Sequence, residues 1–129
     1  MILKKLTVTF IAIILAGCSS QPLVKSSSGE LTQLGKASFY ADKYQGRTTA
    51  NGERFDQQAA TAAHLKLAFG TKVKVTNLAN NKSVIVRVND RGPYIRGRII
   101  DLSSSMFKKI ADPKVGVIDV QVTVIDKAN

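Results

Sequence analysis

Two short segments of the sequence concentrate side chains that can transfer protons or bind sugars. The first contains Glu53, just after an Asn-Gly pair, and His64, the one histidine of the chain. The second contains Asp90 in an Asp-Arg-Gly-Pro run and Asp101 in an Ile-Asp-Leu-Ser run. Two carboxyl groups beside an apolar core can divide the roles of acid and base, as they do in enzymes that cleave glycosidic bonds. Acid–base chemistry on a glycan is therefore one interpretation of these residues.

Each of these side chains also has a purely structural interpretation. Glu53 follows a turn and can be an ordinary surface carboxylate. A single histidine is more often a buried hydrogen-bonding residue than a catalyst, and it cannot form a zinc site with several histidines. The carboxylate of Asp90 can cap its own turn, or pair with Arg91 or Arg98. The residues by themselves leave catalysis and structure equally open.

The elements around these segments are expected to be short strands. Residues 72–78 alternate charged residues with Val, residues 79–82 form an Asn-rich turn, and residues 83–89 return, which predicts a half-buried hairpin. Further strands are expected at residues 36–40, 98–102 and 120–125, and one short helix, capped by a Ser, at residues 103–110. Many short strands with one helix indicate a small barrel.

The length and the charge limit what this barrel can be. A chain of 129 residues has room for one domain, which we place at residues 34–126. The formal net charge of +10 suits an anionic polymer such as nucleic acid, acidic lipid or an acidic cell-wall glycan, or simply favours solubility. One cysteine excludes a disulfide within the chain.

The N-terminal segment has the order of parts found in bacterial lipoprotein precursors. Two lysines precede an apolar run at residues 6–15, which is shorter than the ~20 residues of a membrane-spanning helix. Leu-Ala-Gly-Cys follows, and it ends at Cys18. We expect residues 1–17 to be a lipoprotein signal peptide and Cys18 to carry the lipid. An ordinary signal peptide with a chance cysteine is the alternative.

The segment after Cys18 is expected to be a tether. Residues 18–33 are rich in Ser and show no hydrophobic period, which is typical of a flexible linker. Several acyl chains on Cys18 would anchor the protein stably to a membrane. Because Ser19 follows the cysteine, we expect the outer membrane, on its periplasmic side, in a host with two membranes.

Four stretches in this order and spacing resemble the rare lipoprotein A family: TTANGERFD, TAAHLKLAFGTKVKVTNL, VIVRVNDRGPY and RIIDLSSSMFKKI. The resemblance covers about residues 35–125, and NDRGPY followed shortly by RIIDLS is its most specific part. It implies a mainly β fold, a six-stranded double-psi β-barrel with one or two short helices. The chain departs from the family at Phe39 and Ala68, where Trp and Pro are common.

The activity implied by the resemblance is that of an endolytic peptidoglycan lytic transglycosylase. Such enzymes cleave the β-1,4 bond between N-acetylmuramic acid and N-acetylglucosamine, and the C6 hydroxyl of muramic acid attacks its own C1 to leave a 1,6-anhydro end. A carboxyl group that acts as the acid must hold its proton near neutral pH, which partial burial favours. The family motifs imply three catalytic positions, Asp90 as the acid with Glu53 and His64 in support, and we expect these three side chains to line one open groove. Asp101 is a second candidate carboxylate. The resemblance also suggests sugar-binding roles for Tyr40, Asn51, Arg91 and Tyr94, with Arg91 facing a lactyl or peptide carboxylate.

The expected partners follow from the same resemblance. They are peptide-poor glycan strands of peptidoglycan, the membrane through Cys18, and proteins of the division machinery. Nothing in the sequence indicates a metal or an organic cofactor. Nucleic acid is not expected, because we expect the chain to be exported and its sequence has no aromatic stacking motif of the RNP kind. A non-catalytic, expansin-like lipoprotein that binds peptidoglycan is the alternative function.

Overall fold

A computed structural model of the chain describes residues 22–25 and 29–128. The predicted signal peptide and Cys18 lie outside these residues. The strands are β1 (Val24–Lys25), β2 (Leu31–Phe39), β3 (Thr61–His64), β4 (Lys72–Asn77), β5 (Ser83–Asp90), β6 (Arg98–Leu102) and β7 (Ile118–Asp126). The helices are α1 (Ser104–Ile110) and two 3-10 turns, η1 (Asp42–Tyr44) and η2 (Pro113–Val115). No helix of the described residues is long and apolar enough to cross a membrane.

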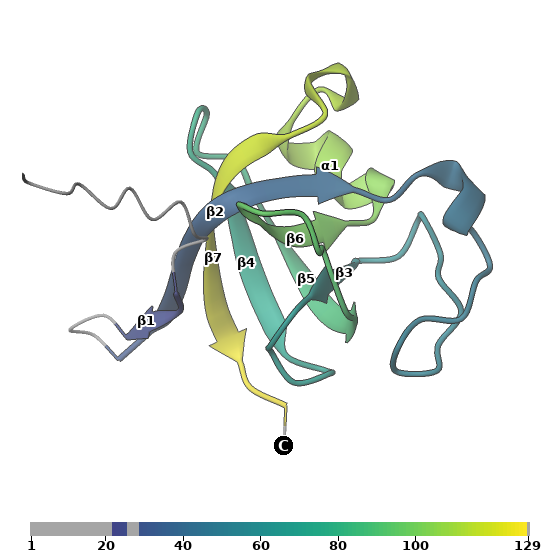
Figure 1. Cartoon of the computed structure of the whole chain (residues 1–129). Coiled ribbons are helices and arrows are strands. Elements are labelled where there is room, and N and C mark those ends of the chain that lie inside the picture. Colours follow the sequence, from purple (N-terminus) through teal and green to yellow (C-terminus); the bar gives the residue numbers. More distant parts are fainter. Residues whose placement is uncertain (1–21, 26–28, 129) are drawn as a thin grey trace, which may run out of the picture.

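Six of the strands close into a barrel, which Figure 1 shows with α1 packed at one end. The ring runs β2-β6-β3-β5-β4-β7 and returns to β2, and β1 pairs with the first two residues of β2. The pairs β2–β6 and β3–β5 are parallel, and the other neighbours are antiparallel. Closure leaves no free edge in the ring. This is the six-stranded double-psi β-barrel that the sequence predicted.

The strand predictions hold best where the hydrophobic pattern alternates. Strands β4 and β5 form the expected antiparallel hairpin, with Val73 and Val75 buried and Lys72 and Lys74 exposed. Strand β2 begins at Leu31, five residues before the predicted strand and within the segment predicted to be a tether. It is long because its first half pairs with β7 and its second half with β6.

Two further details differ from the expectation. Strand β3 was not predicted as a strand, because all four of its residues are buried and it shows no alternation. Ser103 precedes α1, but its side chain makes no capping hydrogen bond and donates instead to the carbonyl oxygen of Ala59 at 2.5 Å.

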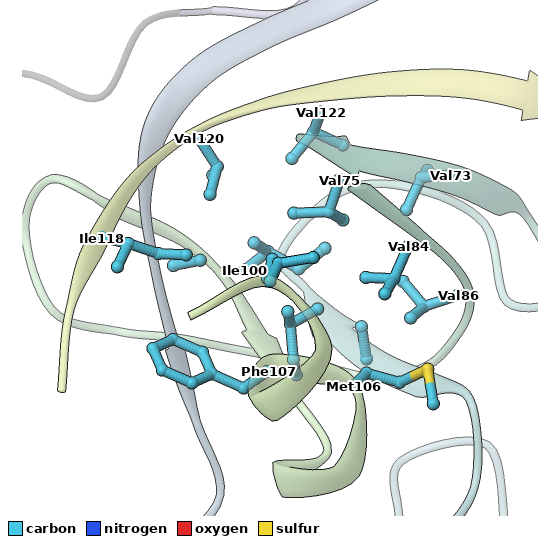
Figure 2. Packing of buried hydrophobic residues seen from close by; sticks show 14 of the residues in the cluster. Val73, Val75, Val84, Val86, Ile100, Met106, Phe107, Ile118, Val120 and Val122 are labelled. Atoms are coloured by element: carbon cyan, nitrogen blue, oxygen red, sulfur yellow. The ribbon is translucent and has the colours of Figure 1, made fainter. Parts of the chain in front are cut away.

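The barrel interior is aliphatic and is closed by α1. Valines from β4, β5 and β7 point inward, and Phe107 and Met106 of α1 pack beneath them around Ile100 (Figure 2). Phe107 and Ile100 are fully buried. A closely packed interior fixes the positions of the strand ends. The loops that carry the polar residues of the site begin at these ends.

Candidate active site

An open cavity of about 750 Å³ lies where β2, β5 and the loops that follow them meet. The lining includes Tyr40, Tyr44, Arg47, Phe55, Asp90, Arg91, Tyr94, Arg98 and Asp101. A second cavity has a similar volume, about 760 Å³, and a mainly apolar lining around Leu34, Leu78 and Val117. Its charged lining residues, Lys36 and Asp119, form an exposed ion pair with each other. The first cavity therefore holds the residues suited to acid–base chemistry.

Asp90 is the last residue of β5, and neutral donors hold its carboxylate at the cavity. The Tyr40 hydroxyl donates to Oδ2 at 2.6 Å, and the backbone N–H groups of Ala50 and Arg91 each donate to Oδ1 at 2.9 Å. The side chain is half-buried, as expected. The chain turns away directly afterwards at Gly92, whose φ of 130° is a conformation that side-chain-bearing residues rarely adopt. The carboxylate is thereby fixed in position by groups from three separate segments.

Tyr40, for which a sugar-binding role was predicted, lines the cavity and also contacts Asp90. Its ring lies against Phe55, with 4.2 Å between centroids, and edge-on to Tyr44 at 5.9 Å. Burial, and then the hydrogen bond to Asp90, raise the pKa of the Tyr40 hydroxyl above its usual range. The hydroxyl therefore stays protonated and donates to Asp90 across the physiological pH range.

Asp101 lines the same cavity but is already paired with a cation. Arg98 donates to Asp101 Oδ1 at 3.0 Å, and the Ser38 hydroxyl bonds both Asp101 and Arg98. Asp90 forms no ion pair with any described residue. Asp90 is thus the better candidate for the reacting carboxyl group, and Asp101 braces the floor of the cavity.

Glu53 is not one of the lining residues of the cavity, and Arg87 binds its partly exposed carboxylate. Arg87 binds both of its carboxylate oxygens, at 2.6 and 2.8 Å, and the side-chain amides of Asn51 and Asn89 donate at 2.9 and 3.3 Å. These hydrogen bonds, that of Arg87 first, lower the pKa of Glu53 to about 2. The backbone N–H of Asn51 also donates to the Asn89 carbonyl at 3.2 Å, beside the N–H of Ala50 that reaches Asp90. Glu53 therefore fixes the loop that supplies one donor to Asp90.

The His64 imidazole faces a different pocket, of about 300 Å³, which Gln33 also lines. Ala63, one residue earlier on β3, lines the main cavity, because successive residues of a strand face opposite sides. The expectation that Glu53, His64 and Asp90 line one cavity is therefore wrong, since only Asp90 does so. Whether Glu53 and His64 are required for catalysis stays a prediction.

The hydrogen bonds of His64 define its protonation state. Nδ1 accepts the backbone N–H groups of Lys66 and Leu67, both at 3.1 Å, so the ring proton is on Nε2, which donates to Gln33 Oε1 at 2.8 Å. Burial, and then the charges of Arg91 and Lys66, lower the pKa of His64 to about 4. The neutral ring caps the turn at residues 64–67.

That turn holds Arg91, whose guanidinium was expected to bind substrate. Arg91 Nη1 donates to the carbonyl oxygens of His64 and Leu67, at 3.1 and 2.8 Å, and the guanidinium lies 4.0 Å from the ring centroid of Phe69. Arg91 thus connects the His64 turn to the backbone N–H that binds Asp90. Tyr94 is 81% exposed at the cavity and is free to contact a sugar.

Several supporting residues were not anticipated from the sequence. They are Gln33, Ser38, Arg87 and Asn89. Arg87 lies in the second strand of the predicted hairpin, and nothing in the sequence connects it with Glu53. Gln33 lies in the segment predicted to be a tether, so it gave no signal at all.

Solved structures of similar shape include two classes of protein. The Streptomyces papain inhibitor superposes with a TM-score of 0.58 and 25% identity, over 73% of this chain and 94% of that chain. The expansin of Clavibacter michiganensis superposes with a TM-score of 0.57 and 27% identity, over 76% of this chain and 52% of that chain. A mutant of this expansin has been solved in complex with cellohexaose, with a TM-score of 0.57.

Relatives in sequence are more similar. The "Probable endolytic peptidoglycan transglycosylase RlpA" of Synechocystis is 54% identical over 91 residues, which are 70% of this chain and 28% of that protein. The endolytic peptidoglycan transglycosylase RlpA of Vibrio cholerae is 47% identical over 106 residues, 82% of this chain and 40% of that protein. The chain thus spans less than half the length of these relatives. The family model described as lytic transglycolase matches residues 32–122. The chain belongs to this lytic transglycolase family, that of the rare lipoprotein A proteins.

Proposed function

We propose that the protein is an endolytic lytic transglycosylase that cleaves the β-1,4 bond between N-acetylmuramic acid and N-acetylglucosamine in peptide-poor glycan strands. The observation that carries the proposal is the carboxyl group of Asp90, held at the open cavity by Tyr40, Ala50 and Arg91 without an ion pair among the described residues. The names of the related proteins support the same reaction.

The reaction needs one carboxyl group that first gives and then accepts a proton. Asp90 protonates the glycosidic oxygen as the bond from that oxygen to C1 of muramic acid breaks, so that N-acetylglucosamine leaves with a 4-hydroxyl group. The C6 oxygen of the same muramic acid then bonds to C1, and its hydroxyl proton passes to the Asp90 carboxylate. No water is consumed, and Asp90 ends in the protonation state in which it began.

The other residues act on Asp90 or on the sugar. Tyr40 orients the carboxylate through its hydrogen bond. Glu53 and His64 support the segments that supply the two backbone donors. Tyr94 offers an exposed ring at the cavity, a surface on which sugars commonly stack. Asn51, expected to bind substrate, donates to Glu53 and belongs to the support of the loop.

Digestion of peptide-stripped sacculi, followed by mass detection of 1,6-anhydro ends, tests the proposal. The native protein should release anhydro products, and Asp90→Asn should fold normally, bind glycan and release none. If Asp90→Asn released products at the native rate, Asp90 would not be the acid and Asp101 would become the candidate.

The second candidate function is glycan binding without cleavage. Its support is the structural similarity to an expansin, and to a mutant expansin solved with cellohexaose. A native protein that bound glycan strands but released no anhydro product would favour this function.

We also propose that Cys18 carries lipid that holds the protein to a membrane, in hosts with two membranes the outer one, facing the periplasm. The support is the order of charged, apolar and small residues before Cys18. Glycan strands and proteins of the division machinery are the partners proposed for this location.

A further inference from the structure

We propose that Arg47, assisted by Lys43, binds a carboxylate of the glycan substrate at the rim of the cavity. This inference rests on the proposed function, because muramic acid is the sugar that brings a carboxylate to the site. The carboxylate is either the lactyl group of a muramic acid without its stem peptide, or an acidic group of an attached peptide. Arg91, which the sequence suggested for this role, is held by the protein itself.

The charges that line the cavity are unbalanced. Four cationic side chains face it, and only two carboxylates, Asp90 and Asp101, do so. Arg98 is paired with Asp101, and Arg91 donates to two backbone carbonyl oxygens. The remaining cations, Arg47 and Lys43, form no ion pair and donate no side-chain hydrogen bond within the described residues.

A shared aromatic ring holds these two cations in place. The guanidinium carbon of Arg47 lies 5.1 Å from the centroid of Tyr44, and Nζ of Lys43 lies 5.3 Å from it. The backbone supports this arrangement, because Arg47 N–H donates to the Tyr44 carbonyl at 3.0 Å and the Arg47 carbonyl accepts Phe55 N–H at 2.7 Å. A cation placed over an aromatic face keeps its N–H edges free for an acidic ligand.

Contacts of the Tyr44 and Tyr40 rings link these cations to the carboxyl group of Asp90. Tyr44 meets Tyr40 edge-on at 5.9 Å, and the Tyr40 hydroxyl binds Asp90. Asp90 and Arg47 line the same cavity, so a glycan that presents its glycosidic oxygen to Asp90 can also reach Arg47. The planar fork of Arg47 can bind both oxygens of a carboxylate, whereas Lys43 supplies a point charge.

Arg54 provides a matched control. Arg54 is exposed and lies on the same loop as Arg47, and its backbone pairs with that of Thr48, the residue after Arg47. Arg54 does not line the cavity. Replacing either Arg47 or Arg54 by Gln removes the same charge from the same loop. A difference between the two variants therefore reports the position of the charge and not the net charge of the protein.

Binding is best measured in an Asp90→Asn background, so that no strand is cleaved, by fluorescence anisotropy with labelled probes. The probes are peptide-stripped glycan strands, the same strands with their lactyl carboxylates amidated, strands that keep their stem peptides, and chitohexaose, which has no carboxylate. Arg47→Gln should weaken binding of a carboxylate-bearing probe roughly three- to fivefold, the size expected for an exposed charge pair, and Arg54→Gln should not. Amidation of the lactyl carboxylates should weaken binding by a similar factor when the protein keeps Arg47. It should not change binding to the Arg47→Gln variant.

The probe that loses affinity identifies the source of the carboxylate. A loss confined to peptide-stripped strands assigns the lactyl group, and a loss confined to peptide-bearing strands assigns the peptide. Equal effects of Arg47→Gln and Arg54→Gln, or an undiminished effect of Arg47→Gln on amidated strands and chitohexaose, would overturn the carboxylate site while leaving the proposed function intact. If no probe bound at all, the proposed function would fail together with this site.

Discussion

The Tyr40 hydroxyl donates a hydrogen bond of 2.6 Å to Oδ2 of Asp90, from a residue 50 positions earlier in the chain. Because this bond joins the end of β2 to the end of β5, it makes the orientation of the carboxyl group depend on barrel closure. Tyr40→Phe should therefore fold, keep its ring packing, and lose activity about ten- to a hundredfold, the cost of one hydrogen bond to a charged group. The measurement is the rate of anhydro-end release, with the thermal midpoint as the folding control. A native rate in a folded variant would remove Tyr40 from the catalytic arrangement.

His64 offers a choice of substitutions that separates positioning from proton transfer. Asn places an acceptor where Nδ1 of His64 receives two backbone N–H groups, whereas Gln places its polar atoms near Nε2. We expect His64→Asn to stay within about tenfold of native activity, and His64→Gln to lose about a hundredfold as the turn that holds Arg91 loosens. Equal and complete inactivity of both folded variants would instead indicate that His64 transfers a proton.

The free energy of unfolding should change with pH as His64 titrates. Its pKa is about 4 in the folded protein against an ordinary value of 6.5, so the unfolded chain binds more protons between these values. Stability should therefore be full above pH 6.5 and fall as the pH drops toward 4, by up to about 3 kcal/mol. Urea unfolding across this range checks it, and His64→Asn should remove this part of the loss. Glu53, with its pKa lowered to about 2, adds a separate loss only below about pH 4.5.

The Glu53–Arg87 pair should act on activity more than on stability. Both side chains are more than a third exposed, so the ion pair itself contributes at most about 1 kcal/mol to folding. Glu53→Gln and Arg87→Gln should each lower the rate of anhydro-end release about tenfold, because the loop that brings Ala50 to Asp90 loses its anchor. The double variant should be no worse than either single one. If the losses in rate of the two single variants multiplied in the double variant, the two residues would act separately.

The proposed lipid attachment depends on Cys18, which lies outside the described residues. Cys18→Ala should abolish fatty-acid labelling and leave an unprocessed precursor, because the thiol is the only attachment point that the sequence offers. Labelling and the size of the product on gels measure both effects together. Normal labelling in the variant would end the lipoprotein proposal.

The sequence predicted the parts of this fold that local patterns encode. The alternation of Val with Lys in residues 72–78 sufficed for the hairpin, and the motifs sufficed for the barrel type. The direction of a buried side chain was not encoded in this way. Ala63 and His64 are neighbours on a fully buried strand, so no pattern told which of them faces the cavity. The partners of His64 and Arg91 are largely backbone groups, which residue types do not reveal.

Strand β2 also sets the direction in which the protein would work. The described chain first meets the barrel where Val24 and Lys25 pair with Thr32 and Leu31, whereas Phe39, at the other end of β2, lines the cavity, so roughly 26 Å of strand separates these two points. With lipid at Cys18, the barrel would be held through residues that pair with the start of β2, and Asp90 would lie near the end of that strand, where it binds Tyr40. The distance from the membrane at which the cavity could meet glycan would then depend on the length of the segment between Cys18 and β1. Shortening the tether would limit which layers of glycan the cavity can touch, without altering a single residue of the site.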